Sequence, residues 1–235
     1  MRGRIAILAC LALVPASTAT GSDAAPACPP TLANQLASTG SARQLITVVT
    51  VRHSSTNGML RAWAKRGECW VPVAGPWPAW VGQRGISENK REGDRKTPSG
   101  AFGIQRTMYG VAPNPGVRYR YHRIVCGDWW VEDPDSRFYN RFFHVRCGTR
   151  PPFDTTGDDM SRSPEAYKYL AVIDYNTDPV IPGRGSGIFL HVSRGNPTIG
   201  CVSLPESRLL TVLRWLRPAR EPLIVIGTRK TIRKF

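Results

Sequence analysis

Residues 187–204 constrain the fold of this chain more than any other stretch. They read G-I-F-L-H-V-S-R-G-N-P-T-I-G-C-V-S-L, so an apolar run ends at a histidine, and a cysteine follows ten residues later behind a glycine. A short apolar run bounded by glycine predicts a buried strand, and Gly200 lets the backbone turn tightly before Cys201. Leucines at helical spacing come next. The stretch therefore predicts a strand, a turn that carries a thiol, and then a helix.

The residue types in this stretch suit a thiol nucleophile and its base. A thiol attacks well only as a thiolate, and an imidazole within hydrogen-bond reach accepts its proton at neutral pH. We therefore expect Cys201 to be the nucleophile and His191 to be the base. A helix start would favour the thiolate, and the N–H groups around Gly200 and Cys201 would hold the oxyanion of acyl transfer. The alternative is that Cys201 is a small buried apolar residue.

The spacing of these residues resembles that of a known family. The pattern H-x6-T-x-G-C, from His191 through Thr198 and Gly200 to Cys201, is similar to that of the L,D-transpeptidase catalytic domain (YkuD) family, bacterial enzymes that remodel peptidoglycan. The resemblance implies that Cys201 is the nucleophile and His191 the base. It also implies that Thr198 and Gly200 belong to the substrate or oxyanion site.

A second segment carries the same resemblance, which covers about residues 45–227. Residues 90–102, K-R-E-G-D-R-K-T-P-S-G-A-F, are similar to the family's K-x-E-G-D-x-x-T-P-x-G-x-F segment, which borders the active site. By itself this segment is typical of a solvated loop. The chain differs from the commonest family pattern at Ile199, where many members have histidine, and at Ser203, a substrate-contacting position. Its short histidine-to-cysteine spacing is typical of a branch with hydrolytic members, so transfer and hydrolysis both stay open.

The N-terminus has the pattern of a secretory signal. Arg2 and Arg4 precede the apolar residues 5–14, and small residues suitable for cleavage follow. A lipoprotein site at Cys10 is less favoured because only nine residues precede it, and the apolar run is too short for a membrane-spanning anchor. The expected organisation is a signal peptide at 1–19, a leader at 20–43, a catalytic domain at 44–228 and a basic tail at 229–235. We expect the protein to be secreted to the periplasm or cell wall.

Removal of the signal leaves an odd number of cysteines, which are Cys28, Cys69, Cys126, Cys147 and Cys201. An odd count in an exported chain predicts paired cysteines and one thiol. Four paired cysteines allow three connectivities, and the sequence does not choose among them. We favour Cys28 with Cys69 and Cys126 with Cys147. That pairing would leave Cys201 as the thiol, in agreement with its expected catalytic role.

The charge of the chain indicates anionic partners. The formal net charge is +15 and falls to +13 when the two arginines of the signal are removed. Such a field attracts peptidoglycan stem peptides, through their carboxylates, and anionic wall polymers. The alternative is that most of these side chains only solvate the surface. No basic run interleaved with aromatic residues is present, so we expect no nucleic acid partner, and we expect a monomer.

Other catalytic chemistries have weaker support in the sequence. There is no C-x2-C pair and no H-x3-H pair, so we expect no metal, and no cofactor is needed. His53, His122 and His144 are alternative bases, although a lone histidine is usually an ordinary surface or core residue. Asn140, which follows a tyrosine, has the pattern of a turn and also resembles segments that recur in this branch of the family.

The hydrophobic pattern predicts a mainly β fold. Strands are expected at 44–51, 59–65, 129–132, 171–175, 187–192 and 223–227, with an edge strand and loop at 70–81. A helix is expected at 205–216, where leucines share one face, and a short one at 163–170. The family resemblance implies a β-sandwich of mixed sheets with a helix following the catalytic cysteine.

The sequence thus predicts an exported cysteine acyltransferase of peptidoglycan. The resemblance implies an L,D-transpeptidase that forms 3-3 cross-links through a thioester on Cys201. One alternative is an L,D-carboxypeptidase, or a hydrolase that releases wall-linked peptides or proteins. A further alternative, from another class, is a basic wall-binding protein without catalysis, in which Cys201 would have no role.

Overall fold

The computed structural model describes residues 27–155 and 158–235. The expected signal peptide at 1–19, and the leader up to residue 26, lie outside the described residues. Within the described part of the chain, no helix has the length and apolar character needed to cross a membrane.

The strands are β1 (Gln44–Thr50), β2 (Asn57–Arg66), β3 (Cys69–Trp80), β4 (Ile86–Ser87), β5 (Thr97–Pro98), β6 (Gly100–Gly110), β7 (Arg120–Arg123), β8 (Asp128–Trp130), β9 (Phe142–His144), β10 (Asp158–Asp159), β11 (Leu170–Ile173), β12 (Phe189–Val192), β13 (Val202–Leu204) and β14 (Leu223–Thr228). The helices are α1 (Glu206–Trp215) and short 3-10 turns at Ala33–Gln35, Met160–Arg162, Ala166–Lys168, Pro218–Arg220 and Ile232–Lys234.

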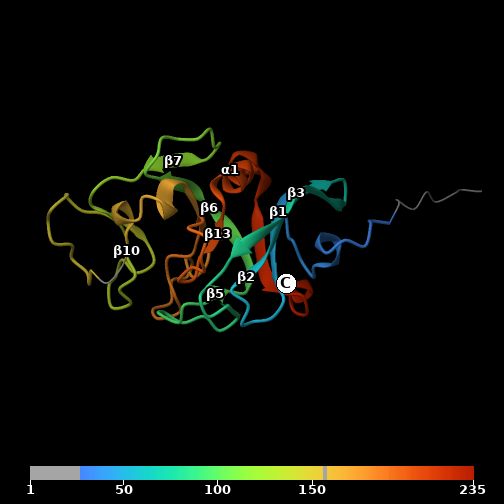
Figure 1. Ribbon diagram of the computed structural model, residues 1–235, viewed down its shortest axis with the longest axis horizontal. Helices are drawn as coiled ribbons and strands as arrows, with labels where there is room; N and C mark the ends of the chain where they lie inside the picture. Colours follow the sequence, from blue (N-terminus) through green and yellow to red (C-terminus); the bar gives the residue numbers. More distant parts are fainter. Residues whose placement is uncertain (1–26, 156–157) are drawn as a thin grey trace, which may run out of the picture.

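One large mixed sheet organises the fold (Figure 1). Its order is β11-β12-β13-β3-β2-β1-β14-β6-β7, with β1 parallel to β14 and antiparallel to β2. Because β11 also pairs with β6, the sheet curls until its two halves face each other around the core. This confirms the expected mainly β fold of mixed sheets with a helix after Cys201.

Strand β1 shows why the sheet forms where it does. Its sequence Q-L-I-T-V-V-T is buried almost throughout, because both faces of the strand are covered. Ile46 and Val48 point into the main core, together with Leu190 of β12. Leu45 points the opposite way and packs with Trp63 in a second apolar cluster. Alternate side chains of one strand thus join two cores, as the period of two requires.

Helix α1 closes one side of the main core. It begins at Glu206, after Pro205, and ends at Trp215, within the range expected from the sequence. Its residues Leu209, Val212 and Leu213 are buried against the main core. The same spacing that predicted the helix therefore supplies its packing face.

The two disulfides confirm the favoured pairing. Cys28 is bonded to Cys69, and Cys126 is bonded to Cys147. The second bond closes the segment that contains β8 and β9, which form a small sheet with β10. In Figure 1 this small sheet forms a lobe on the side of the molecule away from β1 and β3. Cys201 is the one cysteine of the described residues that is outside a disulfide.

Three regions differ from the expected outline. Strand β6, which was not expected, pairs with β14, β11 and β7. Strand β3 forms one long strand on β2 and reaches β13 only at Trp80, so most of its second edge is unpaired. Both ends of the described chain pack onto the sheet: the side chain of Asn34 exchanges hydrogen bonds with the backbone of Trp70, and Ile232 is fully buried.

Candidate active site

The backbone of β12 holds the sulfur of Cys201. Cys201 lies just before β13, which runs parallel to β12. The N–H of Phe189 donates to Sγ at 3.3 Å, and the thiol donates to the carbonyl of Gly187 at 3.2 Å. The cysteine is only 9% exposed. An N–H that already points at the sulfur would stabilise a thiolate there, because hydrogen bonds to the charged form favour it.

His191 lies on the same strand as Phe189, two residues further along, so both side chains project from one face of β12. Its Nδ1 donates to the carbonyl of Val192 at 2.8 Å. In the neutral ring this bond places the proton on Nδ1 and makes Nε2 the proton acceptor. The ring of Tyr167 packs edge-on against the imidazole, with centroids 5.8 Å apart. The orienting partner that the sequence could not name is thus the Val192 carbonyl.

Burial keeps His191 neutral. The imidazole is 8% exposed, and desolvation lowers its pKa from 6.5 to about 4, although hydrogen bonds with the backbone of Val192 and Ala166 work in the opposite direction. At pH 7 the ring therefore carries no charge. A neutral imidazole is the form that a general base requires.

Two threonine hydroxyls fix the turn that carries Cys201. The hydroxyl of Thr198 donates to the Cys201 carbonyl at 2.6 Å and accepts from the N–H of Gly200 at 3.1 Å. The hydroxyl of Thr97 donates to the same carbonyl at 3.1 Å. Gly200 has φ +155°, and a Cβ there would lie 3.2 Å from the carbonyl of Lys96. Thr198 therefore holds the turn, and the N–H of Gly200 donates within it.

The expected helix start beside the thiol is wrong. Cys201 leads into β13, and α1 begins only at Glu206. The sequence V-S-L alternates, so Val202 and Leu204 enter the main core while the backbone pairs with β12. Pairing with β12 gives backbone N–H and C=O groups of this buried segment their hydrogen-bond partners. The N–H of Phe189, and not a helix terminus, faces the sulfur.

Ser203 lies beneath the surface and not at the cleft. It is the register partner of His191 on the neighbouring strand and is 1% exposed. Its hydroxyl has no hydrogen-bond partner among the described residues. The position expected to contact substrate is thus inside the protein, opposite His191 on the neighbouring strand.

A cavity of about 320 Å³, called here the Cys201 cleft, opens in front of the thiol. The polar part of its wall comes from the 90–102 segment and from residues far from it in sequence. Its lining residues are Lys90, Glu92, Gly93, Glu132, Ser163, Tyr167, Ser186, Gly187, Ile188, Ile199, Gly200 and Cys201. The segment that resembles the family's motif therefore does form a wall of the site.

Glu92 joins two segments of that wall. It accepts a hydrogen bond from the hydroxyl of Ser186 at 2.6 Å and another from the hydroxyl of Tyr139. The phenol oxygen in turn accepts from the N–H of Gly185 at 3.1 Å. Burial, followed by the adjacent Glu92 carboxylate, raises the pKa of Tyr139 well above its ordinary value, so it stays a donor. The carboxylate is thereby held in one position at the cleft.

Lys90 is a buried cation in the same wall. It is 4% exposed, and its Nζ donates to Asp94 at 2.7 Å and to the carbonyl of Arg91 at 2.8 Å. Burial raises the pKa of Asp94, but hydrogen bonds from Lys90, Arg91 and Lys96 outweigh it and leave the pKa below 3.8. The ion pair fixes the loop that presents Glu92.

Asn140 links the lobe to the catalytic turn. Its Oδ1 accepts from the indole of Trp130 at 2.9 Å and from the N–H of Gly187 at 3.0 Å. Its Nδ2 donates to the carbonyls of Tyr175 and Asn176 at 3.0 and 2.7 Å. Since the carbonyl of Gly187 accepts a hydrogen bond from the Cys201 thiol, Asn140 positions the residue that orients this thiol.

Several of these wall residues carry no signal in the sequence, because they meet only in the folded chain. Two of the alternative bases differ from His191 in their partners. His122 and His144 each bind the buried carboxylate of Asp128 at 2.7 Å, whereas His191 lies on β12, whose Phe189 N–H reaches the sulfur of Cys201. Within the described ranges, no three His, Cys, Asp or Glu side chains gather as metal ligands would.

Comparison with known proteins places this site in a family. The sequence model of the L,D-transpeptidase catalytic domain (YkuD) matches residues 47–228. Among solved structures, the chain is similar to the helical cell shape determining protein Pgp2 from Campylobacter jejuni, at 15% identity and a TM-score of 0.41. That similarity covers 82% of this chain and 50% of the Pgp2 chain, so this chain spans about half the length of Pgp2. Among curated proteins, none matches. The family match over most of the sequence shows that this chain belongs to the L,D-transpeptidase catalytic domain family.

Proposed function

We propose that this protein is an exported cysteine acyltransferase that forms 3-3 cross-links between peptidoglycan stem peptides. One observation carries the proposal: Cys201 lines a cleft in a chain of the L,D-transpeptidase family, and its Sγ accepts from the N–H of Phe189, on the same strand and face as the neutral, buried His191. Stem peptides are the substrates of that family. The disulfides and the secretory pattern at 1–19 support a site of action outside the cytoplasm.

The first half of the reaction forms a thioester. Nε2 of His191 accepts the proton of the Cys201 thiol, and the thiolate attacks the carbonyl at the L-centre of diaminopimelate, which is joined to D-alanine. N–H groups at the Cys201 turn hold the oxyanion while the C–N bond breaks. The leaving amine of D-alanine takes the proton from His191. The acyl group is then bonded to sulfur.

The second half transfers the acyl group. An amine of a neighbouring stem attacks the thioester, His191 accepts its proton, and that proton returns to the sulfur as the C–S bond breaks. If water attacks in place of the amine, the product is a trimmed stem. Ile199 favours the amine, because this large apolar side chain lines the cleft and is 71% exposed. An apolar rim suits contact with a second peptide and exclusion of water.

Intact mass spectrometry after incubation with a carbapenem, an acylating inhibitor of this family, tests the nucleophile. We expect one covalent adduct on the wild-type chain, none on Cys201→Ala and much slower formation on His191→Gln. A matched control is Ser203→Ala, a buried change beside the base that leaves both groups in place. An adduct that persists in Cys201→Ala, or none on the folded wild type, would contradict the proposal and favour the wall-binding alternative.

The partition of the thioester tests the acceptor. A stem tetrapeptide ending in D-alanine is supplied with and without a second stem that carries a free amine. We expect release of D-alanine and a cross-linked product in proportion to the acceptor. Ile199→Ser should shift the products towards hydrolysis. Trimmed stems alone, at every acceptor concentration, would assign the protein as an L,D-carboxypeptidase.

A further inference from the structure

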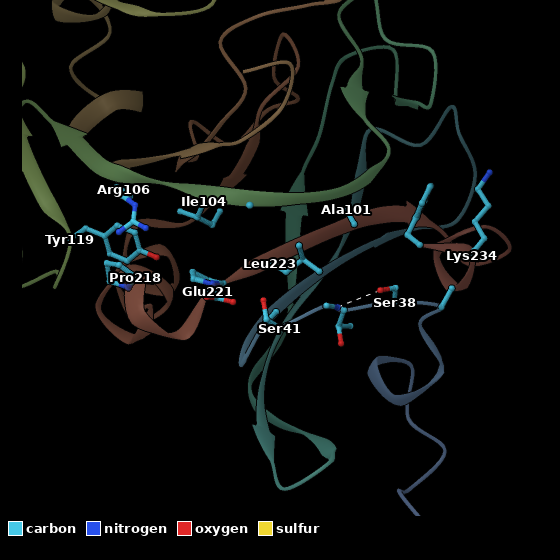
Figure 2. Close-up of a pocket in the computed structure, with 17 residues that line it drawn as sticks. Ser38, Ser41, Ala101, Ile104, Arg106, Tyr119, Pro218, Glu221, Leu223 and Lys234 are labelled. Carbon is cyan, nitrogen blue, oxygen red and sulfur yellow. Dashed lines mark hydrogen bonds between the residues drawn. The ribbon is translucent and has the colours of Figure 1, made fainter. Parts of the chain in front are cut away.

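A cavity larger than the Cys201 cleft lies away from the thiol. It has a volume of about 660 Å³ and lies over β6 and the start of β14, where it shares no lining residue with the Cys201 cleft. We call it the Tyr119 cavity. Figure 2 shows its walls, formed by β6, by residues 37–42 and by the residues after α1. Its volume lies in the range of small-ligand sites, about 300 to 1,000 Å³.

A buried hydroxyl in this cavity lacks a partner. Tyr119 is 6% exposed, and its phenol oxygen makes no hydrogen bond to any described residue. In Figure 2 the hydroxyl points into the cavity, from the end where Arg106 and Pro218 lie. Burial raises the pKa of Tyr119 well above its ordinary value, so the group stays protonated. Buried hydroxyls nearly always have a partner, and an acceptor brought by a ligand would complete this one.

The positive charge of arginine side chains acts on the same hydroxyl. Arg106 and Arg217 both act electrostatically on the Tyr119 phenol, and Arg118 acts on Arg217. Within the described residues, no ion pair includes any of the three. The acidic side chain in the lining is Glu221. Of the three, Arg106 lines the cavity, so it brings a positive charge without a bound carboxylate to the end where Tyr119 lies. The guanidinium of Arg217 donates to backbone carbonyls of residues 214–216 and adds its charge from outside the lining.

The rest of the lining suits a peptide. Ala101, Gly103 and Leu223 form the side made by β6 and β14, and residues 37–42, A-S-T-G-S-A, form the opposite side. Small apolar side chains with a few hydroxyls leave room for an extended chain of small residues. Such a wall offers little to a bare phosphate, which needs several charged or N–H donors.

We propose that the Tyr119 cavity binds the carboxylate end of a short peptide, with the hydroxyl of Tyr119 and the guanidinium of Arg106 as its recognition groups. The cavity is a second peptide site, independent of the Cys201 thiol. Peptidoglycan stems end in such carboxylates. The ligand is therefore either a stem attached to the polymer or a peptide released from it.

Binding of N-acetyl-Ala-Ala-Ala and its C-terminal amide to the full chain carrying Cys201→Ala tests the site without acyl transfer. We expect the acid to bind at least about tenfold more tightly than the amide, since a charged hydrogen-bonded contact is lost in the amide. Tyr119→Phe and Arg106→Gln should each weaken binding of the acid by a similar factor. Tyr119→Phe removes one unpartnered hydroxyl, and a melting temperature at least as high as that of the parent would show that it folds.

Backbone NMR shifts on titration locate the peptide. Shifts near Tyr119 and Ala101 support the proposal, and Ala101→Phe, which fills an exposed part of the cavity, should abolish them. Shifts confined to the Cys201 cleft would overturn it. Equal binding of acid and amide, unchanged affinity in Tyr119→Phe, or equally tight binding of inorganic phosphate would also overturn it.

Retention on intact peptidoglycan separates the two sources of the ligand. Weaker retention of Tyr119→Phe than of its parent, both with Cys201→Ala, would assign the site to stems on the polymer. Equal retention together with loss of tripeptide binding would assign it to released peptide. Because the thiol is absent throughout, these results stand whether or not the proposed acyl transfer is correct.

Discussion

The Cys201 cleft and the Tyr119 cavity differ in whether their polar groups are hydrogen-bonded within the protein. At the cleft, the carbonyl of Cys201 accepts two threonine hydroxyls, and Glu92 accepts two more hydroxyls from other segments. In the cavity, the Tyr119 hydroxyl has no partner among the described residues. A polar group that is fully bonded within the protein is fixed in place, whereas an unbonded one costs stability until a ligand binds.

This difference separates two kinds of site. In the proposed reaction a nucleophile and a base need one geometry before substrate arrives, and internal hydrogen bonds at the cleft suit that requirement. The cavity gains its hydrogen bonds only from what it binds. If the comparison is correct, removing polar groups should destabilise the chain at the cleft and stabilise it at the cavity.

The largest effect is expected at Asn140, which is 3% exposed and whose amide makes four hydrogen bonds around Gly187. We expect Asn140→Ala to lower the free energy of unfolding by roughly 3 to 5 kcal/mol, because buried groups lose their partners. Acylation by a carbapenem should slow at least about 100-fold as Gly187 shifts. Urea unfolding and adduct formation measure the two effects. Asn114→Ala, at an exposed turn, should cost at most about 1 kcal/mol and leave acylation unchanged.

A second large effect follows from the pKa of His191, which burial lowers from 6.5 to about 4. Between pH 6.5 and pH 4 the unfolded chain binds a proton at His191 that the folded chain does not bind. The contribution of His191 to the free energy of unfolding is therefore fully present above pH 6.5 and is lost as the pH falls towards 4. The loss approaches roughly 3 kcal/mol. Urea unfolding at pH 7.5 and 4.5 should show it, and His191→Gln should flatten that dependence. Identical pH profiles for the two proteins would mean that His191 is not buried neutral.

A smaller effect is expected at the catalytic turn. Thr198→Val keeps the shape of the side chain but removes the hydroxyl that binds the Cys201 carbonyl and the Gly200 N–H. We expect a loss of about 2 kcal/mol and at least a tenfold slower acylation, because the turn is no longer fixed. Thr47→Val, which removes the acceptor of the Trp63 indole, should lose stability without slowing acylation. Equal acylation rates in both variants would show that the turn does not depend on Thr198.

Sequence reasoning succeeded where chemistry is local in the chain. The thiol of Cys201, outside both disulfides, the helix α1 and most strands follow from spacing within short windows, whereas the role of His191 as base stays a prediction. Strand β6 was missed because G-A-F-G-I-Q-R-T-M-Y-G is interrupted by glycine and polar residues, and it is held by neighbours on both sides. Ser203 shows the limit of motif transfer, since its position in the family pattern did not reveal that it lies inside the protein.

The walls of the site could not be predicted, because they depend on distant contacts. Glu92 and Ser186 meet across 94 positions of sequence, and nothing in either segment indicates the other. Asn140 has the sequence pattern of a turn, and its φ of +55° is consistent with one, yet its side chain binds across the lobe. Tyr119 carries no signal at all, since an unpartnered hydroxyl is visible only once its surroundings are known.

The smallest effect is also the sharpest test of the comparison. Tyr119 and Ser203 are the two described residues whose buried side-chain oxygens have no partner. Tyr119→Phe and Ser203→Ala each remove such a group, so we expect each to raise the free energy of unfolding by about 1 kcal/mol. Thermal unfolding, repeated with saturating N-acetyl-Ala-Ala-Ala, measures both. The tripeptide should then stabilise the parent and Ser203→Ala but not Tyr119→Phe, because only Tyr119 faces a cavity that holds a ligand. Equal stabilisation of all three proteins would mean that the Tyr119 hydroxyl is a packing defect like that of Ser203, and the contrast between the cleft and the cavity would disappear.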